Sequence, residues 1–182
     1  DQADKSPQYF ASGWHDREAK IPANPHALFK IASISKLYDA VAVTNLVNDG
    51  RLSLDKTIAD YLPELVGRIE NSDKITLRLM IQHRSGIPNF TSGIPNFTDA
   101  PNFWAAPTKT YKESLALILD KSANFEPGKN YEYCNTNYLL INKIMDDVLG
   151  YDNFQFVQEK ILTPLNLKNN FGSLSEVNID DV

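Results

Sequence analysis

The clearest pattern along the chain is a run of apolar side chains at helical spacing between residues 33 and 49. Apolar positions recur three or four residues apart at Ile34, Leu37, Val41, Ala42, Leu46 and Val47. Gly50 follows, where a C-terminal helix cap is favoured. Further apolar side chains extend the surface to the remaining sides, namely Tyr38, Ala40 and Val43. We therefore expect a central helix that is buried nearly all round.

Shorter segments with the same periodicity predict more helices toward the C-terminus. They cover residues 77–81, 111–121, 135–149 and 154–162. Thr76 is placed to cap the first of them, Gly150 closes the third, and Pro164 stops the last. Residues 8–14 are rich in aromatic side chains and predict a short strand, which a polar turn follows. The coarse prediction is one strand and about five helices.

A heptapeptide is repeated in the middle of the chain. Residues 85–91, Ser-Gly-Ile-Pro-Asn-Phe-Thr, recur without a change as residues 92–98. Two copies of so short a unit do not make a solenoid. We interpret the repeat as a duplicated surface loop, because loops tolerate insertions, and we assign it no functional role.

Composition and charge exclude several classes of partner. The chain has 182 residues, of which 42% are hydrophobic and 23% charged, as in an ordinary globular domain. The net charge is −5 and the basic residues are scattered, which argues against a nucleic-acid-binding face. The longest nearly apolar run, residues 40–43, is far too short to span a bilayer. We expect neither a nucleic-acid partner nor a membrane span, and the oligomeric state stays open.

The familiar cofactor and metal motifs do not occur in the sequence. His15, His26 and His83 have no metal-ligand spacing, and there is no phosphate-cradling glycine loop or dinucleotide fingerprint. We therefore expect no cofactor and no metal, and we interpret the histidines as structural, with His83 at the end of a helix. Cys134 is the single cysteine and cannot form an intrachain disulfide. We interpret it as a spectator, because no histidine partner is evident near it in the sequence.

A Ser-x-x-Lys spacing at the start of the long predicted helix is the first candidate for catalysis. A serine hydroxyl is a weak nucleophile and needs a base within hydrogen-bond reach. Ser33 and Lys36 are three residues apart, so on a helix they share one face near the positive end of the dipole. Apolar neighbours such as Ala40 and Val43 favour the neutral lysine that can accept a proton. We predict Ser33 as the nucleophile and Lys36 as its activating partner.

The same spacing occurs a second time, at Ser53 and Lys56. These two residues lie in a polar connector that no apolar helix follows directly, so we interpret them as part of a solvated turn. A single Ser-x-x-Lys match is therefore a weak signal, and its context decides between the two copies.

The second candidate is the Tyr-Cys-Asn sequence of residues 133–135, just after a Pro-Gly turn and at the start of a predicted helix. A tyrosine whose phenolate is stabilised by a lysine can act as base or acid in acyl transfer. An amide two residues later can hold a substrate amide by hydrogen bonds. We predict these roles for Tyr133 and Asn135. Residues 151–153, Tyr-Asp-Asn, have the same spacing, but there we expect a helix cap.

Four segments of the chain, taken together and in order, resemble one known family. Residues 29–37, Phe-Lys-Ile-Ala-Ser-Ile-Ser-Lys-Leu, resemble the catalytic segment of the class C β-lactamases and of related penicillin-binding esterases and DD-peptidases. Residues 46–63 look like the connector of that family, and residues 75–88 look like the helix and loop that come next. Residues 133–138 resemble its Tyr-x-Asn segment. The resemblance covers roughly residues 8–170.

The resemblance implies an acyl-serine mechanism on an α+β fold of the β-lactamase/transpeptidase type, in which a helical region packs on an antiparallel sheet. Ser33 would attack a carbonyl, Lys36 and Tyr133 would shuttle its proton, and Asn135 would hold the substrate. The backbone N–H of Ser33 would form half of an oxyanion hole. The substrate would be a β-lactam, a peptidoglycan-like peptide or a small ester. The location implied is the periplasm or cell envelope.

The sequence also departs from the pattern of that family. Nothing up to Val182 matches its third motif, Lys-Thr-Gly or His-x-Gly, and Cys134 stands where serine is more usual. We expect residues 1–182 to be a single domain, incomplete at both ends, that holds mainly the helical part and exposes an apolar helical face. The missing third motif favours an alternative interpretation, a catalytically silent ligand binder or scaffold that keeps the fold.

Overall fold

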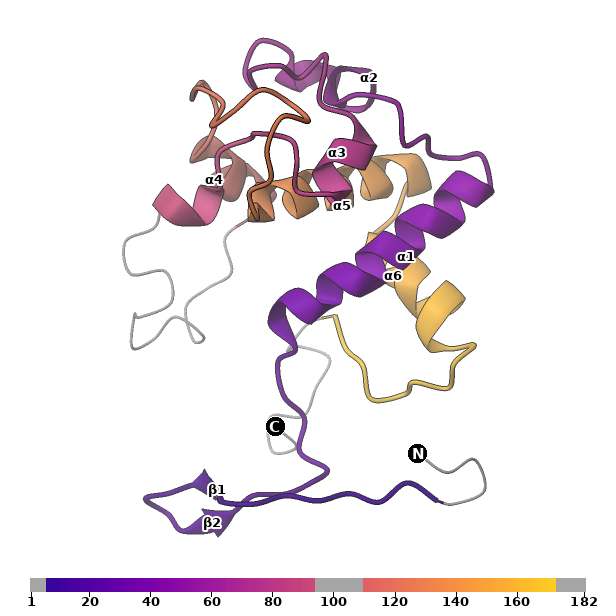
Figure 1. Ribbon diagram of the computed structural model, residues 1–182. Helices are drawn as coiled ribbons and strands as arrows, with labels where there is room; N and C mark the ends of the chain where they lie inside the picture. Colours follow the sequence, from indigo (N-terminus) through magenta and orange to yellow (C-terminus); the bar gives the residue numbers. More distant parts are fainter. Residues whose placement is uncertain (1–5, 94–109, 173–182) are drawn as a thin grey trace.

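Helices α1 (Ser35–Asn48) and α5 (Asn135–Leu149) form the centre of the folded body in the computed structural model, which describes residues 6–93 and 110–172. The two helices cross in direct contact, and α6 (Asn153–Val157) packs against both (Figure 1). One continuous apolar core lies between them and the shorter helices. Its fully buried side chains include Val43, Leu46, Leu140, Ile141, Ile144 and Met145.

Helix α5 has the predicted bounds, and its ends explain them. Gly150 closes the helix with a φ of 79°, a left-handed conformation that residues with a Cβ adopt at a steric cost. The first turn of α5 buries two polar side chains, Thr136 and Asn137. Buried polar groups need hydrogen-bond partners, and both find them in residues 85–90. The start of α5 is therefore tied to a distant part of the chain.

Helix α1 begins two residues later than predicted, after a 3-10 turn η1 (Ala32–Ile34). The expectation of burial nearly all round is wrong. Ala42, Val43 and Leu46 are buried, but the stripe formed by Ile34, Leu37 and Val41 is 60%, 65% and 39% exposed. The reason is that the described contacts of α1 with α5 and α6 leave this stripe uncovered, an exposed apolar surface of the kind we expected for a mainly helical part.

Short helices and turns connect α1 to the site, and two of the helices have side-chain caps. These elements are α2 (Ile58–Tyr61), a 3-10 turn η2 (Pro63–Leu65), α3 (Leu77–Ile81) and a second 3-10 turn η3 (Phe90–Gly93). The side chain of Thr57 caps α2 and that of Thr76 caps α3. The two threonines also form an isolated antiparallel bridge, so the two helix starts lie side by side. The prediction of a helix capped by Thr76 is confirmed.

Two predicted helices have different lengths in the structure. The segment predicted as helical over residues 111–121 forms α4 (Tyr111–Ala116) and then a turn. The turn ends at Asp120, whose φ of 61° cannot continue a helix and whose carboxylate pairs with Arg68 at 2.7 Å. The segment predicted over residues 154–162 forms α6 and a π-helical turn η4 (Gln158–Leu162).

An antiparallel hairpin of β1 (Trp14–Asp16) and β2 (Ile21–Pro22) lies away from the helical body (Figure 1). The predicted strand over residues 8–14 is wrong, since only its last residue, Trp14, belongs to a strand. A ladder needs donors on both strands, and Pro22 and Pro25 deprive the partner segment of backbone N–H groups. The hairpin is the only sheet among the residues that the structure describes, so the described part of the fold is its helical part.

Most of the second heptapeptide copy lies outside the described residues. Of the second heptapeptide copy, residues 92–98, only Ser92 and Gly93 are described. Within residues 6–93 and 110–172, no helix combines the length and the apolar character needed to cross a membrane.

Candidate active site

Ser33 and Lys36 lie where the chain enters α1. Ser33 belongs to the 3-10 turn η1, and Lys36 stands in the first turn of α1, with its Nζ 3.2 Å from the Ser33 Oγ. Ala32, directly before the serine, has a φ of 47°. Such a left-handed alanine is strained and persists only where the surrounding structure holds it. The serine is thus held at the helix entrance, on an exposed part of the surface.

Tyr133 and Asn135 reach the same point from the start of α5. The Tyr133 hydroxyl donates a hydrogen bond of 2.9 Å to the Ser33 Oγ across 100 residues of sequence. The Lys36 Nζ donates to the Asn135 Oδ1 at 3.0 Å. All four residues predicted from the sequence therefore meet in one hydrogen-bonded cluster, with Ser33 between the lysine and the phenol.

The charge of Lys36 governs the electrostatics of this cluster. Its Nζ lies 5.3 Å from the ring centroid of Tyr133 and 5.4 Å from that of Tyr138, within the range of a cation–π contact. Burial alone would raise the pKa of Tyr133, but hydrogen bonds with Lys36 and Ser33, together with the lysine charge, outweigh it. The net result is a Tyr133 pKa below its ordinary value. Such a phenol is a better general base near neutral pH.

The first heptapeptide copy, residues 85–91, holds the start of α5 and so positions Tyr133. The buried Ser85 Oγ donates to the Asn137 Oδ1 at 2.6 Å. The Thr136 Oγ1 donates to the Pro88 carbonyl at 2.8 Å. Ser85, Gly86 and Ile87 of this copy are buried, so our interpretation of it as a surface loop is wrong. The local reason is that α5 buries polar side chains in its first turn, and this segment supplies their partners.

The same segment reaches the site residues themselves. The Asn89 Oδ1 accepts the backbone N–H of Asn135 at 3.2 Å, and the Asn135 Nδ2 lies 3.5 Å from the Thr91 Oγ1. The buried Cys134 thiol donates to the Ile87 carbonyl at 3.3 Å, and burial raises the pKa of this thiol. Cys134 is thus a packed residue and not an exposed thiolate, which agrees with its interpretation as a spectator.

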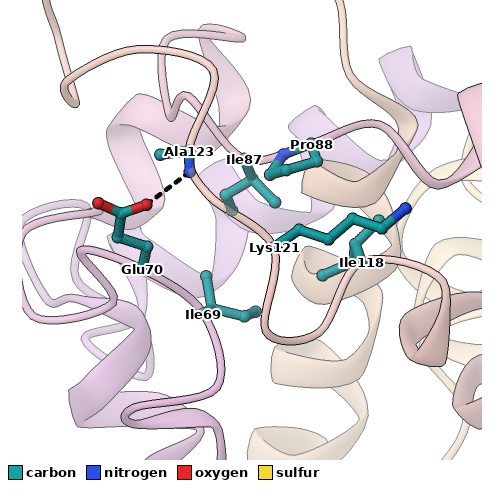
Figure 2. Close-up of a pocket in the computed structure, with 7 residues that line it drawn as sticks. All are labelled: Ile69, Glu70, Ile87, Pro88, Ile118, Lys121 and Ala123. Atoms are coloured by element: carbon teal, nitrogen blue, oxygen red, sulfur yellow. Dashed lines mark hydrogen bonds between the residues drawn. The ribbon is translucent and has the colours of Figure 1, made fainter.

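A close-packed wall supports residues 85–91 from behind. Figure 2 shows the hollow on this side, which Ile87 and Pro88 line together with Ile69 and Ile118. The Glu70 Oε2 accepts the Ala123 N–H at 2.6 Å and closes one edge (Figure 2). The hollow has no interior space for even a water molecule. It is therefore a support for the site segment and not a second ligand pocket.

His83 belongs to the site, although the sequence suggested only a structural helix end. It follows α3 with a φ of 55°, and its ring stacks on that of Tyr133 with centroids 4.5 Å apart. Its Nδ1 accepts the Cys134 N–H at 3.1 Å. No spacing in the sequence points to this contact, because the histidine and the tyrosine are neighbours only through the fold.

Asp39 is a second residue near the site that the sequence did not single out. It lies one turn after Lys36 on α1, and burial raises its pKa to about 6, while the Lys36 charge opposes the shift. The carboxylate also raises the pKa of Tyr138, after the larger effect of burial. Its three-residue spacing from Lys36 could have indicated that Asp39 lies near the site, since residues three apart share a helix face.

The two segments interpreted as structural have structural contacts. The Ser53 Oγ accepts the Asp55 N–H at 3.3 Å within a turn. Asp152 caps α6 by accepting the Phe154 N–H at 2.8 Å. Both predictions are confirmed. Within the described ranges, His, Cys, Asp and Glu side chains form no group of three that could hold a metal ion.

Comparisons with known proteins identify the family of the chain. The Beta-lactamase family profile matches residues 1–177. Protein flp of Staphylococcus aureus (strain MW2) is 26% identical over 158 residues, which are 86% of this chain and 30% of that protein. This chain therefore spans less than half the length of that curated relative.

Solved structures superpose on most of the chain. D-amino acid amidase from Ochrobactrum anthropi SV3, complexed with L-phenylalanine, matches with a TM-score of 0.72 at 29% identity, over 86% of this chain and 42% of that one. The penicillin binding protein from Bacillus halodurans matches with a TM-score of 0.78 over 98% of this chain and 53% of that one. At 23% identity, the second likeness supports the fold alone. The chain therefore has the β-lactamase/transpeptidase-like fold that its sequence predicts. It belongs to the Beta-lactamase family.

Proposed function

We propose that this chain carries the nucleophile and proton-transfer groups of a serine hydrolase that forms an acyl-enzyme on Ser33. The observation that carries the proposal is the position of the Ser33 Oγ, which lies 3.2 Å from the Lys36 Nζ and 2.9 Å from the Tyr133 hydroxyl. A serine becomes a nucleophile when a base lies within this distance of its hydroxyl. Here two polar groups lie within this distance, and the pKa of the one that can act as base, Tyr133, is lowered by the other.

In the proposed acylation, the Ser33 Oγ bonds to the carbonyl carbon of the substrate while its proton passes to the Tyr133 phenolate. Lys36 stabilises that phenolate by its charge. The tetrahedral intermediate then collapses, the bond to the leaving amine or alkoxide breaks, and the leaving group takes the proton back. In a second step, water attacks the carbonyl carbon of the resulting Ser33 ester, the bond to the Ser33 Oγ breaks, and the acyl group leaves as a carboxylic acid while the serine hydroxyl regains its proton. Asn135 orients Lys36 through its Oδ1 and presents its amide to the substrate.

The proposed substrates are small carbonyl compounds with an amine or alcohol leaving group. The family resemblance supports a β-lactam, a peptidoglycan-like peptide or a small ester, and the amidase among the similar structures adds a small amide. The site residues are exposed or half-buried, which suits a substrate that approaches from the surface. The proposed partner is therefore a small molecule or short peptide.

Reaction of the full-length protein with a fluorophosphonate probe, followed by intact-mass measurement, tests this proposal. We expect one phosphonyl adduct, which Ser33→Ala abolishes. Ser53→Ala is the matched control, because Ser53 has the same spacing to a lysine, and it should leave the adduct in place. An adduct that survives Ser33→Ala overturns the assignment. Adduct formation without turnover of any β-lactam, peptide, amide or ester would instead favour the silent binder.

A further inference from the structure

His83 joins the end of α3 to the segment that carries the proposed general base. Its own carbonyl accepts the Glu132 N–H at 3.0 Å, and its Nδ1 accepts the Cys134 N–H at 3.1 Å. These two contacts bracket Tyr133, whose ring stacks on the imidazole at 4.5 Å. The backbone on both sides of the tyrosine is therefore held by one residue.

The hydrogen bond to Cys134 fixes the protonation state of the ring. A backbone N–H can only donate, so the Nδ1 that accepts it carries no hydrogen, and in the neutral ring the proton is on Nε2. A protonated imidazole carries hydrogen on both nitrogens. Protonation of His83 would therefore place two N–H groups against each other at 3.1 Å and break this contact.

The groups around the ring favour its neutral form. Burial lowers the pKa of His83, the positive charge of Lys36 on α1 lowers it further, and together they outweigh the contact with the Cys134 backbone, which acts in the opposite direction. The other titratable or polar groups that face the ring come from the Tyr133 segment and from α5, namely Tyr131, Tyr133, Cys134, Asn137 and Tyr138.

We propose that His83 is a positioning residue: its neutral Nε2–H tautomer holds the backbone of Cys134, and through it Tyr133 and Asn135, while protonation of the ring releases them. The inference rests on the proposed function, because it concerns the rate at which Ser33 is acylated. It assigns no contact between His83 and the substrate. It predicts that acylation fails on the acid side as His83 takes up a proton.

Two substitutions separate the acceptor of His83 from its stacking surface. His83→Asn keeps an acceptor oxygen near the position of Nδ1, does not titrate, and tolerates the φ of 55°. His83→Phe keeps the stack on Tyr133 and removes the acceptor. We expect acylation of Ser33 at pH 7.5 to be about tenfold faster in the asparagine variant than in the phenylalanine variant, the effect of one buried N–H left without a partner.

The test is the pH dependence of Ser33 phosphonylation by the fluorophosphonate probe, taken as the readout of its acylation, in the full-length wild-type protein and both variants, with ¹⁵N chemical shifts of the wild-type imidazole. We expect the acid limb of the wild type to move to lower pH in His83→Asn, and the shifts to report an Nε2–H ring. Asp39→Asn tests separately the carboxyl group whose pKa is raised to about 6, and should leave the limb that depends on His83 in place.

Equal rates in the two variants, an unchanged acid limb in His83→Asn, or an Nδ1–H ring would each overturn the inference. If His83→Phe does not fold, the wild-type and asparagine profiles and the tautomer still decide. If the wild-type protein takes no adduct, the proposed function fails, and the tautomer alone then tests whether His83 holds the Cys134 backbone.

Discussion

Residues 33–36 and residues 53–56 carry the same Ser-x-x-Lys spacing, and in the fold each pair also acquires a tyrosine. The Lys36 Nζ lies 5.3 Å from the Tyr133 ring, and the Lys56 Nζ lies 5.8 Å from the Tyr61 ring. At the level of residue types and rough distances, the two groups are alike. Their difference lies in which atoms meet.

The first tyrosine contacts the serine side chain, and the second contacts only the serine backbone. The Tyr133 hydroxyl donates to the Ser33 Oγ, whereas the Tyr61 hydroxyl bonds to the N–H and the carbonyl of Ser53. Burial raises the pKa of Tyr61, while the pKa of Tyr133 is lowered against the effect of burial. One phenol is thus suited to accept a proton from serine, and the other anchors a turn. Spacing alone does not make a site.

Removing each lysine in turn should give the largest difference in acylation rate between the two groups. Lys36→Ala takes away a partner of both the Ser33 hydroxyl and the Asn135 amide, so acylation should slow by about 10³–10⁴-fold. Lys56→Ala should leave the rate within about twofold of wild type, because exposed charges far from a site act weakly on it. Rates come from the time course of adduct mass. Equal losses in the two variants would contradict the account.

Replacing each tyrosine hydroxyl gives the next largest effect. Tyr133→Phe should reduce acylation by about 10²–10³-fold, since it removes a proton acceptor next to the Ser33 hydroxyl. In the wild type the rate should also rise with pH through the lowered pKa of Tyr133, in a second limb distinct from the one assigned to His83, and this second limb should vanish in the variant. Tyr61→Phe should preserve the rate and lower the free energy of unfolding by about 1 kcal/mol. Stopped-flow acylation and urea titration separate the two outcomes.

Asp39 lies near Lys36 and Asp60 near Lys56, and their effects on the free energy of unfolding give a further comparison of the two groups. The folded-state pKa of Asp39 is raised to about 6. The contribution of Asp39 to the free energy of unfolding is therefore fully present below pH 3.8 and is lost as the pH rises through 6. Asp39→Asn should exceed the wild type in free energy of unfolding by about 2–3 kcal/mol at pH 8 and match it near pH 3.

Asp60, beside Lys56, should affect the free energy of unfolding with the opposite pH dependence. Bonds from the backbone and side chain of Thr57 lower its pKa, so its contribution is present above the ordinary carboxyl pKa and is lost as the pH falls. Asp60→Asn should therefore be less stable than the wild type at neutral pH, with the difference shrinking in acid. Urea titrations from pH 3 to 8 measure both variants, and a shared sign would refute this part of the account.

The smallest effect concerns the segment that brings Tyr133 to Ser33. Ser85 is buried and bonds to Asn137 at 2.6 Å, while Ser92, its counterpart in the second heptapeptide copy, is exposed. Ser85→Ala should lower the free energy of unfolding by about 1–3 kcal/mol, and Ser92→Ala should change it by less than about 0.5 kcal/mol. A larger loss in Ser92→Ala would mean that the second copy holds α5.

The elements that the sequence predicted well are those with local determinants. Thr76 caps α3 and Gly150 closes α5, and both signals act within a few residues of the helix end they define. The strand over residues 8–14 failed because pairing depends on a partner segment, here one interrupted by prolines. The apolar surface of α1 was visible in the sequence, but which side is covered depends on neighbours far along the chain.

The same distinction applies to the site. Ser33 and Lys36 were predictable as a pair because helical spacing brings them together, and Tyr133 and Asn135 were found as a second pair at a helix start. His83 and residues 85–91 were missed as site components, because their contacts with Tyr133 and Asn135 cross about fifty positions of sequence. The tyrosine beside Ser53 was missed for another reason, since Tyr61 acts through backbone atoms that no motif records.

Peptide mapping of the probe adduct on the unmutated full-length protein tests the central claim most directly. The protein is treated with one equivalent of fluorophosphonate, digested, and sequenced by tandem mass spectrometry. We expect an adduct on the peptide that contains Ser33 and none on the peptide that contains Ser53. An adduct on Ser53, or equal labelling of the two serines, would contradict the claim that Lys36 and Tyr133 single out Ser33.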